Sequence, residues 1–173
     1  MIWTVDPVHS HVGFSVRHMM VTTVRGAFTS FRGTIEIDPA DFTRSRVAGE
    51  IDTASVDTKN ADRDNHLRTN EFFDVANHPK ITFTSTRIER KDEAYVVHGD
   101  LTIRGVTHPV ALDVEYAGTS KNPYGQTVAG LSATGTINRR EFGVQFNALL
   151  ETGGVAVSDK VKLEIEVQAR AEG

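Results

Sequence analysis

Three features of this sequence predict an all-β fold, a closed barrel of antiparallel strands with one short helix. Apolar and polar residues alternate along several segments, which places one face of each segment in the interior. Turn-forming pairs such as Asp38-Pro39 and Asn122-Pro123 separate several of these segments at the spacing expected of a barrel or sandwich. Residues 58–70 are polar and do not alternate, which is typical of a surface helix.

The composition indicates one ordinary globular domain and argues against several classes of protein. The chain has 173 residues, of which 39% are hydrophobic and 24% charged, and this is enough to bury a core or to surround a cavity. A formal net charge of −4 argues against the basic surface of a nucleic-acid-binding protein. The chain has no cysteine, which excludes disulfides, thiol nucleophiles and thiolate metal sites.

The start of the chain carries no sign of a secretion signal. Met1 leads into Asp6-Pro7 with neither a basic start nor an apolar run, and no stretch approaches the roughly 18 apolar residues of a membrane span. We therefore expect a cytoplasmic protein that does not insert stably into membranes. A periplasmic location is the alternative if a leader has been removed.

Period-two alternation identifies eight strand segments. It is clearest near the end of the chain, where every second residue from Val161 to Ala169 is apolar and the residues between them are charged or polar. The expected segments are 12–18, 31–38, 47–53, 81–88, 95–103, 110–116, 127–137 and 161–170. Such a sheet buries its apolar face in a sandwich or in a barrel, and a barrel also leaves no exposed edge.

The polar segment that does not alternate is expected to form a short helix on the surface. Asp57 or Thr58 is a suitable N-cap, because a side-chain oxygen there can accept a backbone N–H of the first turn. The few apolar groups near it are Leu67 and the pair Phe72 and Phe73. They would hold the helix across one end of the barrel.

Small residues on the expected inward faces predict a hollow interior. The inward face of segment 127–137 contains Thr127, Ala129, Leu131, Ala133, Gly135 and Ile137. Gly49 and Gly99 also fall on inward faces, whereas other inward residues such as Phe14 and Phe83 are large. A close-packed core needs large residues throughout, so this mixture predicts a tunnel lined by hydrocarbon. The alternative is a core that the other strands and the helix fill.

The predicted tunnel wall combines large apolar residues with these small ones. Its residues are Val12, Phe14, Val16, His18, Met20, Phe28, Ile51, Leu67, Phe72, Phe83, Leu101, Ile103, Leu131, Ala133, Gly135, Phe142 and Phe146. The candidates for contact with a polar head group are Arg63, His66, Asn138 and Arg139. The last two lie in a second expected helical turn, residues 138–142, where adjacent arginines could offer cations to a diphosphate.

The histidines near the start of the chain are the candidates for a metal site. His9 and His11 have the spacing of one strand face, and His18 is nearby in sequence. No acidic or histidine partner stands at a fixed local spacing, so we expect no metal site. His9 is expected to close a turn or cap a strand, and His11 to face solvent.

A charged cluster on the predicted helix is the candidate for catalysis. Asp62 and His66 are four residues apart and could pair on one helix face. No nucleophile or water-excluding pocket is evident for them. The sequence also lacks a glycine-rich phosphate loop and the Gly-x-Ser-x-Gly and His-Glu-x-x-His motifs. We therefore expect a solvated helix face and a protein that is not an enzyme.

Five blocks of the sequence occur in a familiar order. They are the run from Asp6 to His18, residues 63–67 with 72–74, residues 79–85, residues 99–107 and residues 137–143. Together they resemble the YceI-like family, which are bacterial polyisoprenoid-binding, lipocalin-like proteins. The resemblance covers nearly the whole chain and implies a single domain over residues 1–173.

The resemblance implies an extended eight-stranded, antiparallel, lipocalin-like barrel with a helix between its middle strands. It also implies that the pore binds an isoprenoid chain, such as a polyprenyl lipid or a quinone tail, for storage or transport. A bound lipid is then expected in place of any cofactor. The resemblance transfers no catalytic residue, and the analogy with relatives leaves a homodimer open.

Two other functions stay open from the sequence. One is an enzyme that acts on a prenyl or quinone compound with His66, Arg63 or His18 as its polar groups. The other is a stress-related interaction protein in which the barrel is a filled core. A lipid that can be extracted from the purified protein would favour the carrier over both.

Overall fold

The computed structural model describes residues 1–19, 21–144 and 157–172, which form eleven strands and one α-helix. The strands are β1 (Ile2–Val5), β2 (His11–His18), β3 (Thr22–Phe28), β4 (Phe31–Glu36), β5 (Arg46–Asp52), β6 (Val56–Asp57), β7 (Lys80–Lys91), β8 (Ala94–Ile103), β9 (Val106–Lys121), β10 (Thr127–Asn138) and β11 (Lys160–Ala171). The helix is α1 (Ala61–Leu67), and the 3-10 turns are η1 (Pro7–His9), η2 (Phe42–Arg44), η3 (Thr53–Ser55) and η4 (Arg139–Phe142). No helix in the described ranges has the length and apolar character needed to cross a bilayer.

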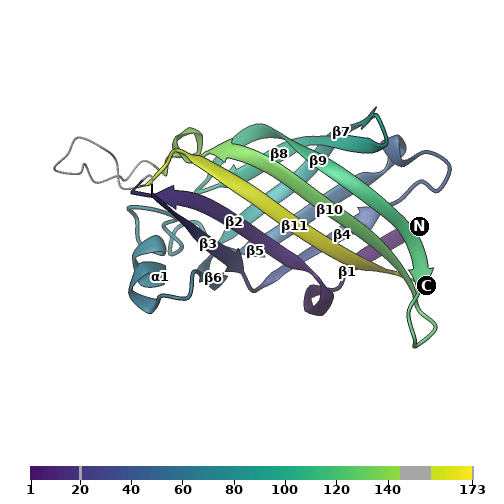
Figure 1. The fold of residues 1–173 in the computed structure, drawn as a ribbon, viewed down its shortest axis with the longest axis horizontal. Coiled ribbons are helices and arrows are strands. Elements are labelled where there is room, and N and C mark those ends of the chain that lie inside the picture. Colours follow the sequence, from purple (N-terminus) through teal and green to yellow (C-terminus); the bar gives the residue numbers. More distant parts are fainter. Residues whose placement is uncertain (20, 145–156, 173) are drawn as a thin grey trace.

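The strands close into a barrel with eight wall positions. Antiparallel neighbours follow the order β1-β4-β5-β7-β8-β9-β10-β11, and β11 pairs back with β1. Three further strands continue positions that are already occupied: β2 continues β1 along β11, β3 continues β4 along β2, and β6 continues β5 along β3. The predicted eight-stranded antiparallel barrel is therefore confirmed, and Figure 1 shows its extended form.

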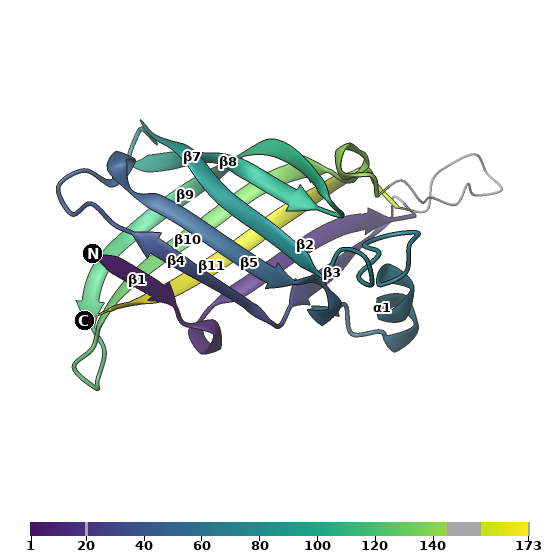
Figure 2. The same cartoon turned by 180° about the vertical axis from the view of Figure 1, so that it is seen from behind.

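The two ends of the barrel are built differently. The N- and C-termini lie together at one end, here called the termini end, and α1 lies at the opposite end, here called the helix end (Figures 1 and 2). Buried apolar residues form two clusters. One contains Trp3 and Phe42 near the termini, and the other contains Val56 and Phe142 near α1. Phe83 and Leu163 pack against both clusters, so the two clusters meet inside the barrel.

The alternation pattern finds the long strands and misses the short ones. Each of the eight predicted segments overlaps an observed strand, whereas β1, β3 and β6 were not expected. The break at η1 leaves β1 with only four residues, and Gly26 and Ala27 interrupt the apolar pattern of β3. Strands that are short or rich in small residues do not show the sustained period-two run on which the prediction depends.

The helix is shorter than expected and has a different cap. Asn60 caps it, because its Oδ1 accepts the Arg63 N–H at 3.0 Å. The prediction of Asp57 or Thr58 as the cap is therefore wrong. Asp57 instead accepts the N–H of Lys59 at 2.9 Å in the turn before the helix, where Lys59 has a φ of 64°. This left-handed turn delays the start of α1.

Candidate functional site

An apolar cavity of about 210 Å³ lies inside the barrel. It extends from Val5 and Phe42 near the termini end to Phe28 and Ile103 near the helix end, and its surface is almost entirely hydrocarbon. An apolar cavity of about 150 Å³ can bind benzene, and pockets for drug-sized ligands begin at about 300 Å³. The cavity therefore accommodates part of a hydrocarbon chain with the side chains as they stand.

The inward faces of the strands supply the wall, in the register that the alternation predicts. The predicted wall residues that line the cavity are Val12, Phe14, Phe28, Ile51, Phe83, Leu101, Ile103, Leu131 and Ala133. Residues that the prediction left out also line it, among them Val5, Phe31, Gly33, Ile35, Phe42, Val47, Ile81 and Leu163. Several of these come from β1, from the start of β4 and from η2, where alternation is short or absent.

Two glycines are paired on neighbouring strands, and one of them leaves part of this wall without a side chain. Gly33 on β4 is the cross-strand partner of Gly49 on β5, and both line the cavity. A Cβ atom added to Gly49 would find no atom closer than the backbone oxygen of Arg32, at 3.8 Å. A Cβ atom at Gly33 would instead lie 3.2 Å from Cγ2 of Val5. The backbone therefore bounds the cavity at Gly49, and this glycine widens it.

Two other glycines that were expected to widen the tunnel do not do so. A Cβ atom at Gly135 would lie 2.7 Å from Cδ2 of Leu112, and one at Gly99 would lie 2.4 Å from Cζ of Phe83. The larger side chain of a neighbouring strand therefore leans over each glycine and fills the space. The prediction of Gly135 as a wall residue is wrong for this reason.

Five more predicted wall residues do not reach the cavity in the described part of the chain: Val16, His18, Leu67, Phe72 and Phe142. Phe142 is completely buried in the core cluster at the helix end, and Leu67 packs against the same cluster. His18 is exposed because it lies at the last position of β2. Met20 and Phe146 lie outside the described residues.

The two polar candidates on α1 make contacts within the protein. Arg63 donates from Nε to Oγ1 of Thr58 and from Nη2 to its backbone oxygen, both at 2.7 Å. Nε2 of His66 lies 2.8 Å from the carboxylate of Glu71, which replaces the expected pair with Asp62. The Arg63 side chain is held against Thr58, in the segment before α1, and the His66 side chain is held at the surface by Glu71. Neither candidate is among the described residues that line the cavity.

The two polar candidates near η4 also have structural roles. Oδ1 of Asn138 caps η4 by accepting the N–H of Arg140 at 3.0 Å, which confirms the predicted second turn. Arg139 is buried and donates to the backbone oxygens of Val144 at 2.8 Å and Ser158 at 3.0 Å. Burial lowers the pKa of Arg139, although a guanidinium remains charged at neutral pH. Its donors are directed at backbone oxygens instead of the cavity.

The histidines near the N-terminus do not share a strand face. His9 lies in η1 and its Nδ1 is 2.8 Å from the carboxylate of Asp6, whereas His11 is the first residue of β2. The His9 contact is the first cause of the lowered pKa of Asp6. His11 is exposed, and its ring lies over Gly13. His9 therefore closes a turn, and the ring of His11 covers Gly13.

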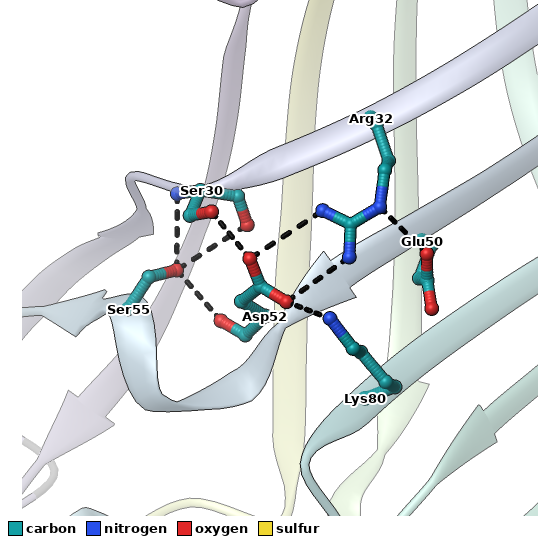
Figure 3. Close-up of polar contacts among 6 residues, drawn as sticks. All are labelled: Ser30, Arg32, Glu50, Asp52, Ser55 and Lys80. Carbon is teal, nitrogen blue, oxygen red and sulfur yellow. Dashed lines mark hydrogen bonds and ion pairs between the residues drawn. The ribbon is translucent and has the colours of Figure 1, made fainter.

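A charged cluster on the outer surface fixes the end of β5 near the helix end (Figure 3). Arg32 donates to the carboxylate of Asp52 at 3.1 Å, and Lys80 and the hydroxyl of Ser30 donate to the same carboxylate. These contacts, with Arg32 the largest, hold the pKa of Asp52 well below its usual range. Ser55 extends the cluster, because its hydroxyl donates to the Asp52 backbone oxygen at 2.7 Å and accepts the Ser30 N–H at 3.1 Å.

Thr53 lies along the chain between Asp52 and Ser55 of this cluster. Its buried hydroxyl has no hydrogen-bond partner among the residues that the structure describes. Its side chain is 1% exposed, and its N–H donates to the backbone oxygen of Pro79 at 3.0 Å. Two residues before it, Ile51 lines the cavity together with Ile81, its cross-strand partner. Nothing in the sequence distinguishes this threonine, because a threonine at a strand end is ordinary.

Comparison with known proteins places this barrel in a family. Residues 3–169 match the YceI-like domain. The chain belongs to the YceI-like family. Among YceI-like relatives, it is similar to a UPF0312 protein of Staphylococcus epidermidis, with 44% identity over 164 residues and 94% of each chain covered. It is also similar to a UPF0312 protein of Staphylococcus aureus, with 42% identity over 167 residues that cover 96% of this chain and 95% of the relative.

Solved structures show the same YceI-like barrel. The chain is similar to BcnA of Burkholderia cenocepacia, with a TM-score of 0.81, 25% identity and coverage of 95% and 98% of the two chains. It is similar to a YCEI protein of Campylobacter jejuni, with a TM-score of 0.77, 33% identity and coverage of 97% and 96%. A polyisoprenoid binding domain from Saccharophagus degradans, 17% identical with a TM-score of 0.70 and 98% of each chain covered, shares the fold.

Proposed function

We propose that this protein binds a long isoprenoid lipid, such as a polyprenyl chain or a quinone tail, and shields it from water for storage or transport. The observation that carries the proposal is the hydrocarbon-lined cavity along the barrel. Membership of the YceI-like family and the shared fold of a polyisoprenoid binding domain support it.

Burial of the chain supplies enough free energy for such binding. Each methylene taken out of water contributes about 0.8 kcal/mol, so about fifteen carbons contribute roughly 12 kcal/mol. Association and ordering cost about 4–15 kcal/mol. Affinity therefore depends mainly on how much of the tail is buried. A chain longer than the present cavity requires the lining rings of Phe14, Phe28 and Phe83 to turn aside.

The surroundings of the cavity favour binding over turnover. An enzyme needs an acid, base or nucleophile within hydrogen-bond reach of the substrate. The three polar residues considered for that role, Arg63, His66 and His18, are not among the described residues that line the cavity. We therefore propose a binding protein without catalytic residues.

The proposal is tested by blocking the cavity and by analysing what the protein carries. Ala133 on β10 faces the cavity, whereas Ala111 on β9 is exposed on the outer face. Ala133→Phe should abolish uptake of a prenyl alcohol with the β-sheet circular dichroism spectrum retained, and the matched control Ala111→Phe should bind as the wild type does. Mass spectrometry of organic extracts of the wild type should show an isoprenoid lipid.

Two results would contradict the proposed function. The first is an extract without lipid from a protein whose melting temperature also fails to rise when prenyl lipids are added. The second is uptake by Ala133→Phe equal to that of the wild type, which would show that the ligand is not inside the barrel.

A further inference from the structure

Gly49, on the cavity-lining face of β5, is a glycine that the packing of the protein does not require. A glycine inside a strand destabilises a protein relative to alanine. The φ of Gly49 is not positive, so other residues can adopt its backbone conformation. Among the described residues, the atom nearest to an added Cβ would be the backbone oxygen of Arg32, at an ordinary contact distance of 3.8 Å. An alanine would therefore fit at this position.

Other strand glycines of the barrel differ from Gly49 in this respect. A Cβ atom at Gly26 would lie 2.5 Å from Cζ of Phe14, and those at Gly99 and Gly135 would also overlap a neighbouring side chain. Each of these glycines makes room for a side chain of the protein itself. The space at Gly49, which lines the cavity, is left for something that enters the cavity.

We propose that a methyl branch of the ligand lies against Gly49, so that this residue makes the cavity selective for branched hydrocarbon chains over straight ones. The assignment rests on the proposed function and names the part of the ligand that is recognised. A ligand carbon can approach the bare backbone of Gly49 to about 3.5–4 Å. The Cβ of an alanine would hold it farther away.

The side chains around Gly49 give this space the form of a recess. Val47 and Ile51, two residues away on either side, share the inward face of β5 and line the cavity. Phe83 on β7 is the cross-strand partner of Gly49, but the end of its ring leans over Gly99. The ring therefore leaves Gly49 uncovered, and the recess is bounded along the strand by two aliphatic side chains.

The other glycine of the pair does not extend the recess. A Cβ atom at Gly33 would lie 3.0 Å from the backbone oxygen of Ala48 and 3.2 Å from Cγ2 of Val5. Val5 thus covers the β4 side of the pair. The open space is confined to Gly49, which suits a short branch better than a second length of chain.

The chemistry of the recess favours an apolar group. Strand β5 is hydrogen-bonded to β4 on one side and to β7 on the other, so its backbone is engaged within the sheet. The cavity surface around it is almost entirely hydrocarbon. A polar group placed there would lose its hydration without a hydrogen bond in return, whereas a methyl group gains from leaving water.

The test compares two alcohols that differ in branching. Phytanol and hexadecan-1-ol share the length of the main chain and the terminal hydroxyl, and only phytanol carries methyl branches. Affinities are measured by competition with a fluorescent apolar probe, and the wild type should prefer phytanol. Gly49→Ala should lower the affinity for phytanol by roughly fourfold or more, the contribution of one buried methyl group. It should leave the affinity for hexadecan-1-ol unchanged and the melting temperature without ligand unchanged or higher.

Gly130 on β10 provides a matched control for the same substitution. A Cβ atom there would lie 3.5 Å from Cβ of Ala117, which is an ordinary contact, and the φ of Gly130 is not positive. Gly130 is not among the described residues that line the cavity. Gly130→Ala should therefore bind both alcohols as the wild type does, with the β-sheet circular dichroism spectrum retained.

The outcomes separate this inference from the proposed function. If the wild type binds neither alcohol, the proposed function fails. If the wild type binds both equally, or if Gly49→Ala keeps the wild-type ratio of the two affinities, the inference alone is overturned. A lower melting temperature for Gly49→Ala than for the wild type also overturns it, because the fold would then require the glycine. An equal fall in the ratio for Gly130→Ala overturns it as well, because position on the cavity wall would not matter.

Discussion

The termini end and the helix end of the barrel are closed by different forces. At the termini end, the ring of Phe42 stacks on Tyr116 with centroids 4.8 Å apart and lies 4.6 Å from Tyr95, next to the buried Trp3 in the same core cluster. At the helix end, Leu67 and Phe73 pack against the second core cluster, and arginines add hydrogen bonds to backbone oxygens of the segment around α1. Arg104, for example, joins Phe72 to Gly143 at 3.0 and 3.2 Å.

This difference indicates which end can open. The aromatic stack at the termini end belongs to a close-packed core, so opening that end would break aromatic packing contacts. Hydrogen bonds between the segment around α1 and the rim of the barrel can break locally, at a lower free energy than global unfolding. We therefore expect ligands to enter and leave at the helix end.

The largest effect is expected from the aromatic stack at the termini end. Phe42→Ala should lower the free energy of unfolding by about 3–5 kcal/mol, because it leaves a cavity between two tyrosine rings. Urea denaturation followed by circular dichroism measures this change. Tyr124 is 88% exposed, so Tyr124→Ala should leave the free energy of unfolding unchanged. A loss below about 1 kcal/mol for Phe42→Ala would contradict the role given to the stack.

A smaller effect is expected from the buried arginine of η4. Arg139→Met keeps the length of the side chain but leaves the backbone oxygens of Val144 and Ser158 without this donor. It should lower the free energy of unfolding by about 2–3 kcal/mol. Arg140 is exposed and pairs with Asp159, so Arg140→Met should cost much less in the same measurement. Equal losses in the two variants would show that burial of Arg139 does not matter.

A local effect is expected at Arg104, which joins Phe72, in the segment after α1, to Gly143. Arg104 has a φ of 52°, and asparagine tolerates this conformation, so Arg104→Asn removes the guanidinium without straining the turn. The variant should release a bound prenyl alcohol several-fold faster and lose about 1 kcal/mol of stability. Hydrogen exchange should increase for the α1 segment and not for η2. Lys121→Asn at the termini end is the control, and equally fast release from it would contradict the comparison.

The smallest effect is expected from the exposed cluster around Asp52. The pKa of Asp52 is lowered in the folded protein, so its ion pairs stabilise the fold above the unfolded pKa of about 3.9. This stability is lost as the pH falls from that value through the folded pKa. Asp52→Asn should therefore be slightly less stable than the wild type from pH 5 to pH 7, with a difference that shrinks below about pH 4. A difference that peaks near pH 6 would contradict this assignment.

The sequence predicts the barrel well because the barrel depends on alternation. The apolar faces of β8 and β11 follow from the sequence alone, since a residue and its second neighbour share a face in any strand. The short strands β1 and β6 have too few residues to show a period. They are recognised only from their partners in the closed sheet.

The candidate site is less predictable because it depends on neighbours across the sheet. Gly49 and Gly135 both lie on inward faces, yet only Gly49 opens space, because Leu112 covers Gly135. Phe42 comes from a 3-10 turn and cannot be assigned to the interior by alternation. Whether the hydroxyl of Thr53 has a partner is likewise decided by groups that are distant in sequence.

The closure of the sheet has a consequence for the order of events in the cell. The last strand, β11, pairs with β10 on one side and with β2 and β1 on the other, so Trp3 lies opposite Ala171. These contacts join segments that are far apart in the sequence, and such non-local pairing is slow. The closed barrel and its cavity therefore form only after β11 has been synthesised, and a ligand can be enclosed only after that step.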